Sequence, residues 1–398
     1  MSASWQRILK VLIYSLIAIF YLAAILWVTV HATALDYGAY LIGAHGFVTG
    51  QDVYQWGEAG YRDAAKQLGI PYFAYPYRYS PLVALLISPL LAFSYKTGLF
   101  IWCLINAAAV LATGELLSRL SVNRAKCWAI RLSVWLFVPF LTSLYAGQVN
   151  PLPTLLAAMA VLYFKKKRDG IAGWWAALAF AAKPIVLGLL CYPIWKGRWK
   201  AVIASMLSLT FLYSLMTALF GRGSLKAGFP LTIDGSTVGT YPPLQNVWGA
   251  MHRWLTAHDY GWSLINNPVL SNRVGLLLCL ILAIATIALC WPPLRLNSWR
   301  DAGLGMVIAA FVLIIPATWY HHFTILVIPL AILIASAETW IDIVLASVAW
   351  IAINLFGLTW HALAGHTLLL DLGTAGALVI WFGLAGLSFR MRPRNIFP

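Results

Sequence analysis

The sequence predicts an all-α polytopic membrane protein that forms a single integral-membrane domain over residues 1–398. Apolar residues make up 62% of the chain and charged residues only 10%, a balance that excludes an ordinary soluble domain. The apolar residues also gather into repeated uncharged stretches that are long enough to cross about 30 Å of hydrocarbon as helices. The sequence shows neither an internal repeat nor a low-complexity linker, so one domain is the simplest description.

The net charge of +15 bears on the partners of the protein. Lys and Arg cluster in short segments between the apolar runs, as the positive-inside bias of membrane proteins requires. No basic stripe lies on a soluble domain, so we expect membrane lipids as partners and no nucleic acid. The five cysteines lie in or at the edges of hydrophobic stretches, which indicates neither a disulfide framework nor a metal cluster. We therefore expect no cofactor, and the sequence leaves metal dependence open.

The first element is an apolar span over residues 9–31. Arg7 and Lys10 before it and small residues after it imitate a signal peptide, but the apolar run is longer than a signal-peptide core. We therefore expect a retained helix with its N-terminus inside. It delivers the chain into a first extracytoplasmic loop, residues 33–80, whose early part is expected to form an amphipathic helix on the membrane surface over residues 37–48.

Eleven further apolar segments follow, separated by short turns and by a second extracytoplasmic loop, residues 221–272. These segments cover residues 81–93, 97–118, 126–145, 150–164, 171–195, 199–220, 273–291, 302–319, 323–336, 341–360 and 368–389.

Two span counts are compatible with these segments. Counting every segment once gives twelve spans, but it places the basic clusters at residues 119–131 and 165–168 outside, against the positive-inside bias. Treating segments 81–93 and 171–195 as re-entrant obeys the bias and gives ten spans, and a Lys-Pro pair at residue 183 is a plausible break in the second of them. Both counts place both termini inside and both long loops outside.

Asp36 is the first candidate for chemistry, since carboxylates are scarce in this chain. It follows directly on the first span, and the end of a rigid helix fixes a side chain better than a loop tip does. The alternative is a helix-end carboxylate that faces water or caps the helix at residues 37–48.

Lys183, His321 and His322 are the next candidates. Lys183 is a cation inside an apolar segment, so it either lines a polar cavity, where it can hold a lipid phosphate, or snorkels to the basic inner face. The two histidines lie at the outer end of a span. Because adjacent helical residues point about 100° apart, we expect one histidine in a site and the other in the packing, with no third ligand for a metal ion.

Polar side chains of the outer loops and span ends complete the candidates. The amides suit sugar hydroxyls but also cap helices, and the arginines suit phosphate but also pair with nearby acids. No Walker loop, nucleotide-binding glycine fingerprint or nucleophile elbow appears, which argues against a soluble nucleotide sugar as donor. These candidates are Tyr40, Arg78, Tyr79, Gln148, Asn150, Gln245, Asn246 and Arg253.

Several of these residues fall in short motifs whose order and spacing extend over most of the chain. The sequence resembles glycosyltransferase family 87, the polyprenyl-phosphate-mannose-dependent α-mannosyltransferases of GT-C fold. The matching features are Asp36 with Tyr40, Gly50 and Tyr54; Tyr79-Ser80-Pro81-Leu82; Gly147-Gln148-Val149-Asn150; Lys183-Pro184; Gln245-Asn246 with Gly249 and Arg253; and Trp319 with His321-His322.

The resemblance implies a GT-C-like fold with twelve or so spans in the inner (plasma) membrane, and an active site on the periplasmic or extracellular side. It implies that Asp36 is the base and that His321 or His322 assists. It also implies that a hexose, with mannose as the first candidate, is transferred from a polyprenyl-phosphate donor to a lipid or glycan acceptor with inversion of the anomeric centre. Two departures leave the acceptor and the sugar open: residues 244–247 read Leu-Gln-Asn-Val instead of containing Asn-Gln-Ser, and Tyr320 replaces an acid. The alternative function is a secondary transporter or a lipid-linked sugar flippase, which should show an inverted repeat and midplane carboxylates.

Overall fold

The computed structural model describes residues 3–71, 77–221, 239–290 and 302–390. This described part is built from α-helices and short 3₁₀ helices without a β-strand, apart from an isolated bridge between Leu244 and Trp319. Residues 222–238, part of the loop that we expect to be the second extracytoplasmic one, lie outside the described residues.

Seven stretches of the described residues are long and apolar enough to cross a membrane. They are α1 (Ala3–His31), α5 (Tyr95–Ser118), α6 with α7 (Arg124–Trp135 and Val138–Ala146), α11 (Trp199–Phe220), α14 (Pro268–Cys290), α17 (Trp340–Thr359) and α18 (Leu372–Arg390), which the short η5 (Leu369–Asp371) precedes.

Five shorter apolar stretches alternate with them. They are α4 with η2 (Pro81–Ile87 and Ser88–Ala92), α8 (Pro151–Lys165), η3 with α10 (Pro184–Val186 and Gly188–Trp195), α15 (Ala302–Ile314), and η4 with α16 (Tyr320–Leu326 and Val327–Ser336). The remaining helices are α2 (Leu35–Val48), η1 (Val53–Gln55), α3 (Glu58–Gln67), α9 (Asp169–Ala182) and α13 (Val247–Leu255).

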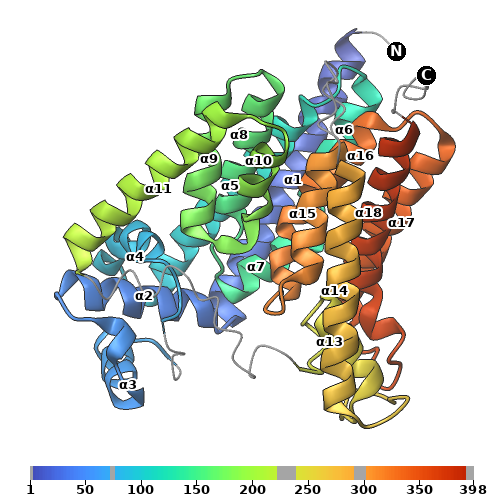
Figure 1. Ribbon diagram of the computed structural model, residues 1–398. Coiled ribbons are helices and arrows are strands. Elements are labelled where there is room, and N and C mark those ends of the chain that lie inside the picture. Colours follow the sequence, from blue (N-terminus) through green and yellow to red (C-terminus); the bar gives the residue numbers. More distant parts are fainter. Residues whose placement is uncertain (1–2, 72–76, 222–238, 291–301, 391–398) are drawn as a thin grey trace.

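Basic side chains gather at one end of the helix bundle. Arg198 donates to the carbonyl oxygen of Phe164 at 2.9 Å and pairs with Asp169, so the α8–α9 turn and the start of α11 meet there. Lys165 Nζ donates to the carbonyl oxygen of Arg119 at 2.9 Å, which adds the end of α5. Figure 1 shows both chain termini at this end, which we call the basic end.

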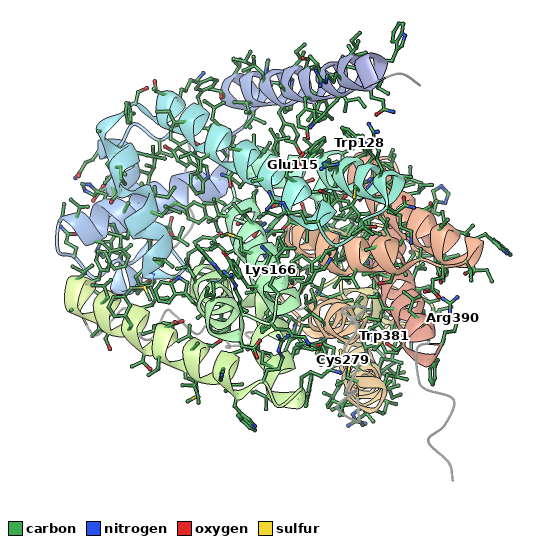
Figure 2. All side chains as sticks on the ribbon, turned by 90° about the horizontal axis from the view of Figure 1, so that it is seen from above. Glu115, Trp128, Lys166, Cys279, Trp381 and Arg390 are labelled. Atoms are coloured by element: carbon green, nitrogen blue, oxygen red, sulfur yellow. The ribbon has the colours of Figure 1, made fainter. Side chains whose placement is uncertain are left out.

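Two contacts bring the C-terminal helices to the basic end as well. Lys126 Nζ, near the start of α6, donates to the carbonyl oxygen of Ala335 at 3.3 Å near the end of α16. Arg390 at the end of α18 pairs with Asp342 at the start of α17. Figure 2 looks down on this end, where Arg390 is labelled.

The opposite end collects the two long loops, and we call it the loop end. The end of α1 meets the end of α7 there, since the rings of Trp27 and Tyr145 stack with centroids 6.0 Å apart. The end of α11 meets α2 through Phe220 and Phe47, whose ring centroids are 4.6 Å apart. Figure 1 shows α2, α3 and α13 at this end.

The helices differ in whether they run between the two ends. α9 leaves the basic end and stops at Lys183, and η3 with α10 returns the chain to Arg198 at the same end, so this segment does not cross. α4 with η2 packs on α2 at the loop end. The elements of the described residues that run from one end toward the other are α1, α5, α6–α7, α8, α11, α14, α15, η4–α16, α17 and α18.

The helix expected at residues 37–48 exists as α2, but it is not amphipathic. Ten of its fourteen residues are buried, since α3, α4, η1, η2 and α7 pack around it. It therefore belongs to the core of the loop end, and Asp36 at its start is held by a buried helix.

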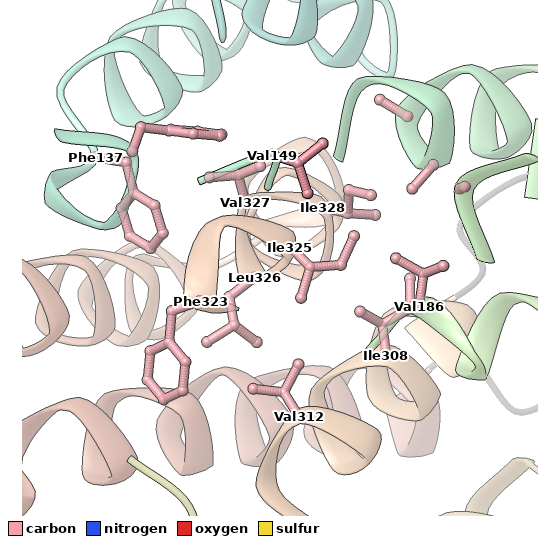
Figure 3. Close-up of a cluster of buried hydrophobic side chains, with 14 of the residues drawn as sticks. Phe137, Val149, Val186, Ile308, Val312, Phe323, Ile325, Leu326, Val327 and Ile328 are labelled. Carbon is pink, nitrogen blue, oxygen red and sulfur yellow. The ribbon is translucent and has the colours of Figure 1, made fainter. Parts of the chain in front are cut away.

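The segment around the two histidines is anchored in the largest apolar core. Figure 3 shows Phe323, Ile325 and Leu326 of η4 among side chains of the neighbouring helices, with Phe137 and Val312 on either side. All five side chains are at least 99% buried. Because close-packed side chains have little freedom to move, this core fixes the backbone that carries His321 and His322.

Candidate active site

Asp36 is placed by a sharp turn between two helices. α1 ends at His31, Ala34 adopts a left-handed conformation with φ 44°, and α2 begins at Leu35. Tyr95 fixes this turn by donating its hydroxyl to the carbonyl oxygen of Thr33 at 2.6 Å. Asp36 lies in the first turn of α2, where the helix dipole favours a negative charge. It is not the capping residue of this helix, since that position is taken by Ala34.

A second turn brings Gln148 to α2. Gly147 ends α7 with φ 71°, a left-handed conformation that favours glycine. A Cβ atom at this position would lie 2.5 Å from the Cβ of Tyr37, so only glycine lets the turn approach α2 this closely. Trp102 holds the turn by donating Nε1–H to the carbonyl oxygen of Gly147 at 2.9 Å.

These two turns and the break after α9 join five side chains into one hydrogen-bonded cluster, the Asp36 network. The hydroxyl of Tyr79 donates to Asp36 Oδ1. Gln148 Nε2 donates to the hydroxyl of Tyr79 at 3.4 Å. Gln148 Oε1 accepts from the hydroxyl of Tyr40 and from Lys183 Nζ, each at 2.8 Å. All five members are among the residues selected from the sequence.

Lys183 points into this network and does not snorkel to the basic end. It caps the C-terminus of α9 in an extended conformation, and Pro184 starts η3, so the predicted break is confirmed. Only 8% of Lys183 is exposed. Its charge interacts with the carboxylate of Asp36 and with both His321 and His322. A buried cation needs such a counter-charge, and Asp36 supplies it through the intervening amide.

The electrostatics of the network keep Asp36 ready to accept a proton. Burial raises the pKa of the Asp36 carboxyl, while the Tyr79 hydroxyl, the Lys183 charge and the Gln148 amide oppose the rise. Burial and the neighbouring Asp36 charge raise the pKa of Tyr79 well above its ordinary value. Tyr79 therefore stays protonated and donates, and the carboxylate is a stronger base than a surface aspartate.

The two histidines lie together at the start of η4, with ring centroids 4.5 Å apart. His322 is held by its own loop: its Nδ1 accepts from the backbone N–H of Trp319 at 3.2 Å, and its ring also hydrogen-bonds the Ala317 backbone. His321 stacks on the Trp319 ring at 6.1 Å. Among the described residues, no side chain or backbone group hydrogen-bonds the His321 ring, so its nitrogens remain available.

Asn150 fixes the position of the histidines relative to α8. Its Nδ2 donates to the carbonyl oxygen of His321 at 2.8 Å and to Ser143 Oγ at 3.1 Å. Ser143 Oγ donates to the same carbonyl oxygen at 3.2 Å. Asn150 thus acts on the backbone of η4, although the sequence placed it among the substrate-binding candidates. Ser143 was not singled out from the sequence, since nothing distinguishes one serine in an apolar helix.

A second cluster, the Arg253 network, holds the other loop candidates. Arg253 Nε donates to Asp371 Oδ1 at 2.9 Å, its Nη2 also pairs with this oxygen, and its Nη1 donates to the Leu244 carbonyl oxygen at 3.1 Å. Trp254 Nε1 donates to Asp371 Oδ2 at 2.7 Å. Arg253 is fully buried. Its charge is thus matched within the protein, and the structure places this guanidinium as a partner of Asp371.

The side chains of Gln245 and Asn246 are likewise hydrogen-bonded within the protein. Gln245 Nε2 donates to the carbonyl oxygens of Pro242 and Leu370, each at 2.7 Å, and its Oε1 accepts from the backbone of Thr374 at 2.8 Å. Asn246 caps α13 by accepting from the backbone of Gly249 at 2.8 Å. The structure thus brings these two amides to the Arg253 network and not to Asp36.

The Arg253 network positions the histidine loop. Asn246 Nδ2 donates to the carbonyl oxygens of Pro316 and Thr318 at 2.8 and 3.1 Å. Tyr320 donates its backbone N–H to Pro243 at 2.7 Å and its hydroxyl to the Ile353 carbonyl oxygen at 2.9 Å. Tyr320 is therefore turned away from Asp36 and packs on α17. Arg78, by contrast, is exposed.

Comparison with known proteins identifies the family of this chain. The model of glycosyltransferase family 87 matches residues 77–316. The chain belongs to glycosyltransferase family 87. A relative in Mycolicibacterium smegmatis, named as a polyprenol-phosphate-mannose-dependent alpha-(1-2)-phosphatidylinositol pentamannoside mannosyltransferase, is 25% identical over 357 residues, which are 87% of this chain and 82% of the relative. The protein is therefore an all-α, multi-pass membrane glycosyltransferase.

The family match covers part of the site of this glycosyltransferase. Tyr79, Gln148 and Lys183 lie within the matched residues, whereas Asp36 precedes them and the two histidines follow them. The placement of Asp36 and of the two histidines near these residues thus depends on the geometry described above. In the described residues, no group of three or more His, Cys, Asp and Glu side chains is arranged to hold a metal ion.

Proposed function

We propose that this glycosyltransferase moves mannose from a polyprenyl-phosphate donor to a hydroxyl of a lipid or glycan acceptor at the extracytoplasmic face, with Asp36 as the base. The observation that carries the proposal is the Asp36 network, in which a carboxylate and a buried cation are held apart by Gln148 and Tyr79. The mannose and the polyprenyl phosphate are supported by the name of the mycobacterial relative.

The reaction needs one base and one stabilised leaving group. Asp36 takes the proton of the acceptor hydroxyl, and the oxygen of that hydroxyl attacks the anomeric carbon on the side opposite the phosphate. The bond between the anomeric carbon and the phosphate oxygen breaks, and polyprenyl phosphate leaves with the electron pair. A single displacement of this kind inverts the anomeric centre.

Asp36 suits the first role because its pKa is raised by burial. A general base works best when its pKa lies close to the operating pH. The opposing influence of Tyr79 and Lys183 keeps enough of the carboxylate charged to accept the proton.

Lys183 and His321 suit the second role. Lys183 presents a buried charge, and a cation in a site of low polarity stabilises a departing phosphate more than it does in water. The His321 ring is held by Trp319 and carries nitrogens that no described residue occupies. His322, whose ring is bound by its own loop, orients His321 by edge-to-face contact.

The distribution of charge supports the extracytoplasmic face. The Asp36 network lies at the loop end, with α2 and the end of α7, while the basic clusters lie at the basic end. Since the basic end is inner by the positive-inside bias, the acceptor and donor head group meet Asp36 outside. We accordingly propose the inner (plasma) membrane as the location.

The test is a transfer assay with purified protein in liposomes that contain native lipid extract. We expect labelled polyprenyl-phosphate-mannose to give a labelled glycolipid and a nucleotide-linked mannose to give none. With a β-linked donor the product should be sensitive to α-mannosidase, as inversion requires. Transfer from the nucleotide sugar, or a product with the donor's own configuration, would refute the proposal.

A further inference from the structure

We propose that Gln148 is a positioning residue that aims the Tyr79 hydroxyl at Asp36, and that Tyr40 and Lys183 fix the orientation of the Gln148 amide. This inference rests on the proposed function, because it concerns the residue proposed as base. It assigns Gln148 a role toward Asp36 instead of the contact with substrate that the sequence suggests.

The orientation of the Gln148 amide follows from its partners. Tyr40 and Lys183 approach the same amide atom, each at 2.8 Å. An ammonium group only donates hydrogen bonds, so the atom that it contacts is the oxygen. Gln148 is 2% exposed, which leaves little room for a rotated amide. Its nitrogen therefore faces the Tyr79 hydroxyl.

The backbone fixes the direction of the Tyr40 hydroxyl. Val149 donates its N–H to the Tyr40 oxygen at 3.3 Å, so this oxygen already acts as an acceptor. The Tyr40 proton then goes to Gln148. Tyr40 thus cannot reverse the direction of the network, and its position on α2 one turn after Asp36 ties both groups to one helix.

Tyr79 is left with one direction for its proton. Its oxygen accepts from Gln148 Nε2, and its O–H donates to Asp36 Oδ1. The hydrogen bonds thus run from Lys183 through Gln148 and Tyr79 to Asp36. Hydrogen bonds to charged acceptors are stronger than those to neutral ones. This series of hydrogen bonds therefore favours the ionised carboxylate of Asp36 and holds one of its oxygens in place.

No other charged group in the described surroundings of α2 could take over the effect of these hydrogen bonds on Asp36. The groups that face Asp36 are Tyr40, Tyr79, Gln148 and Lys183, and the histidines of η4 act through Lys183. The packed neighbour α3 carries its charged residues on the exposed side.

The test compares wild type with Gln148→Met, a variant of similar volume that removes both hydrogen-bonding functions. The control is Gln55→Met, because the exposed Gln55 also donates its amide to a carboxylate, that of Asp52 at 2.8 Å, in the same loop. Two readouts are taken over a pH series. One is transfer activity, and the other is the infrared carboxylic-acid band that Asp36→Asn abolishes, which reports protonation of Asp36 without turnover.

In Gln148→Met we expect the Asp36 band and the acidic limb of the activity profile to move upward together by about one pH unit. Gln55→Met should leave both at the wild-type position. An unshifted Asp36 band in folded Gln148→Met would overturn the inference, as would a raised KM with an unchanged pH profile, which would mark Gln148 as a substrate contact. If wild type transfers no mannose, the proposed function fails, and the infrared titration still decides the role of Gln148.

Discussion

Two polar networks lie toward the loop end of this glycosyltransferase, and they differ in whether their opposite charges are in direct contact. In the Arg253 network the guanidinium touches its carboxylate partner, and Asp371 also accepts from Trp254. In the Asp36 network the carboxylate and the Lys183 cation do not touch, since Tyr79 and Gln148 stand between them. The first arrangement satisfies the charges within the protein, and the second leaves them able to respond to a ligand.

This difference separates residues that look alike in the sequence. Gln148 and Gln245 are both buried glutamines in short motifs near the outer ends of helices. Gln245 binds backbone groups of three separate residues, which makes it a structural link between α13 and α18. The side-chain amide of Gln148 binds only ionisable side chains among its described partners. The partners, and not the residue type, are the reason why we assign the proposed chemistry to the Asp36 network.

The largest expected effect is a loss of stability when the buried ion pair of the Arg253 network is broken. Arg253→Met leaves Asp371 buried without its partner, and removing one member of a buried ion pair costs about 3–5 kcal/mol. We expect this loss in the free energy of unfolding in detergent. Arg253→Met combined with Asp371→Leu should recover much of it, because an apolar pair replaces an uncompensated charge. A stable Arg253→Met protein that has lost only donor binding would instead support a phosphate contact.

A smaller effect on stability and a large effect on transfer are expected for Lys183→Met. The variant removes the cation proposed to stabilise the departing phosphate, a kind of contribution that is worth roughly 10²–10³-fold in rate. Steady-state transfer at saturating donor measures it. Lys196→Met serves as the matched control, since Lys196 belongs to the turn at the basic end. Equal loss in both variants would argue that any missing lysine harms the protein.

The smallest of these effects concerns pH. Asp36 must be ionised to act, so activity should rise with pH through its raised pKa. Tyr79 lowers this pKa, so Tyr79→Phe should move the acidic limb to higher pH by about one unit, which is on the order of tenfold at the acidic end. A pH profile of kcat/KM measures the shift. An acidic limb that moves downward would contradict the direction of the hydrogen bond.

The sequence predicted the fold class from the apolar composition and the break at Lys183 from a charge inside an apolar segment. The catalytic role of Asp36 stays a prediction, and it rests on the scarcity of carboxylates in this chain. The choice between ten and twelve spans stays a prediction, and the ten-span count is the one that obeys the distribution of Lys and Arg. The sequence did not reveal the roles of Gln245, Asn246 and Arg253. Their partners on η5 and before η4 lie far away along the chain, and no local pattern records such a contact.

The prediction of an amphipathic helix at residues 37–48 was wrong for a related reason. A pattern of apolar and polar residues shows which residues are apolar but not which other elements cover them, and five elements, among them α3 and α4, pack around this helix. Burial also raises the pKa of Asp36 at the start of this helix, so the wrong prediction concerns an element that carries the proposed base.

The most direct test of the account compares Asp36→Asn with Asp63→Asn, an exposed carboxylate on α3 in the same loop. Transfer from labelled polyprenyl-phosphate-mannose and binding of the same donor are measured on both purified variants. We predict that Asp36→Asn loses roughly 10²–10⁴-fold in transfer, as expected for a general base, while it still binds the donor, and that Asp63→Asn matches wild type. Wild-type transfer by Asp36→Asn would contradict the assignment of Asp36 as the base.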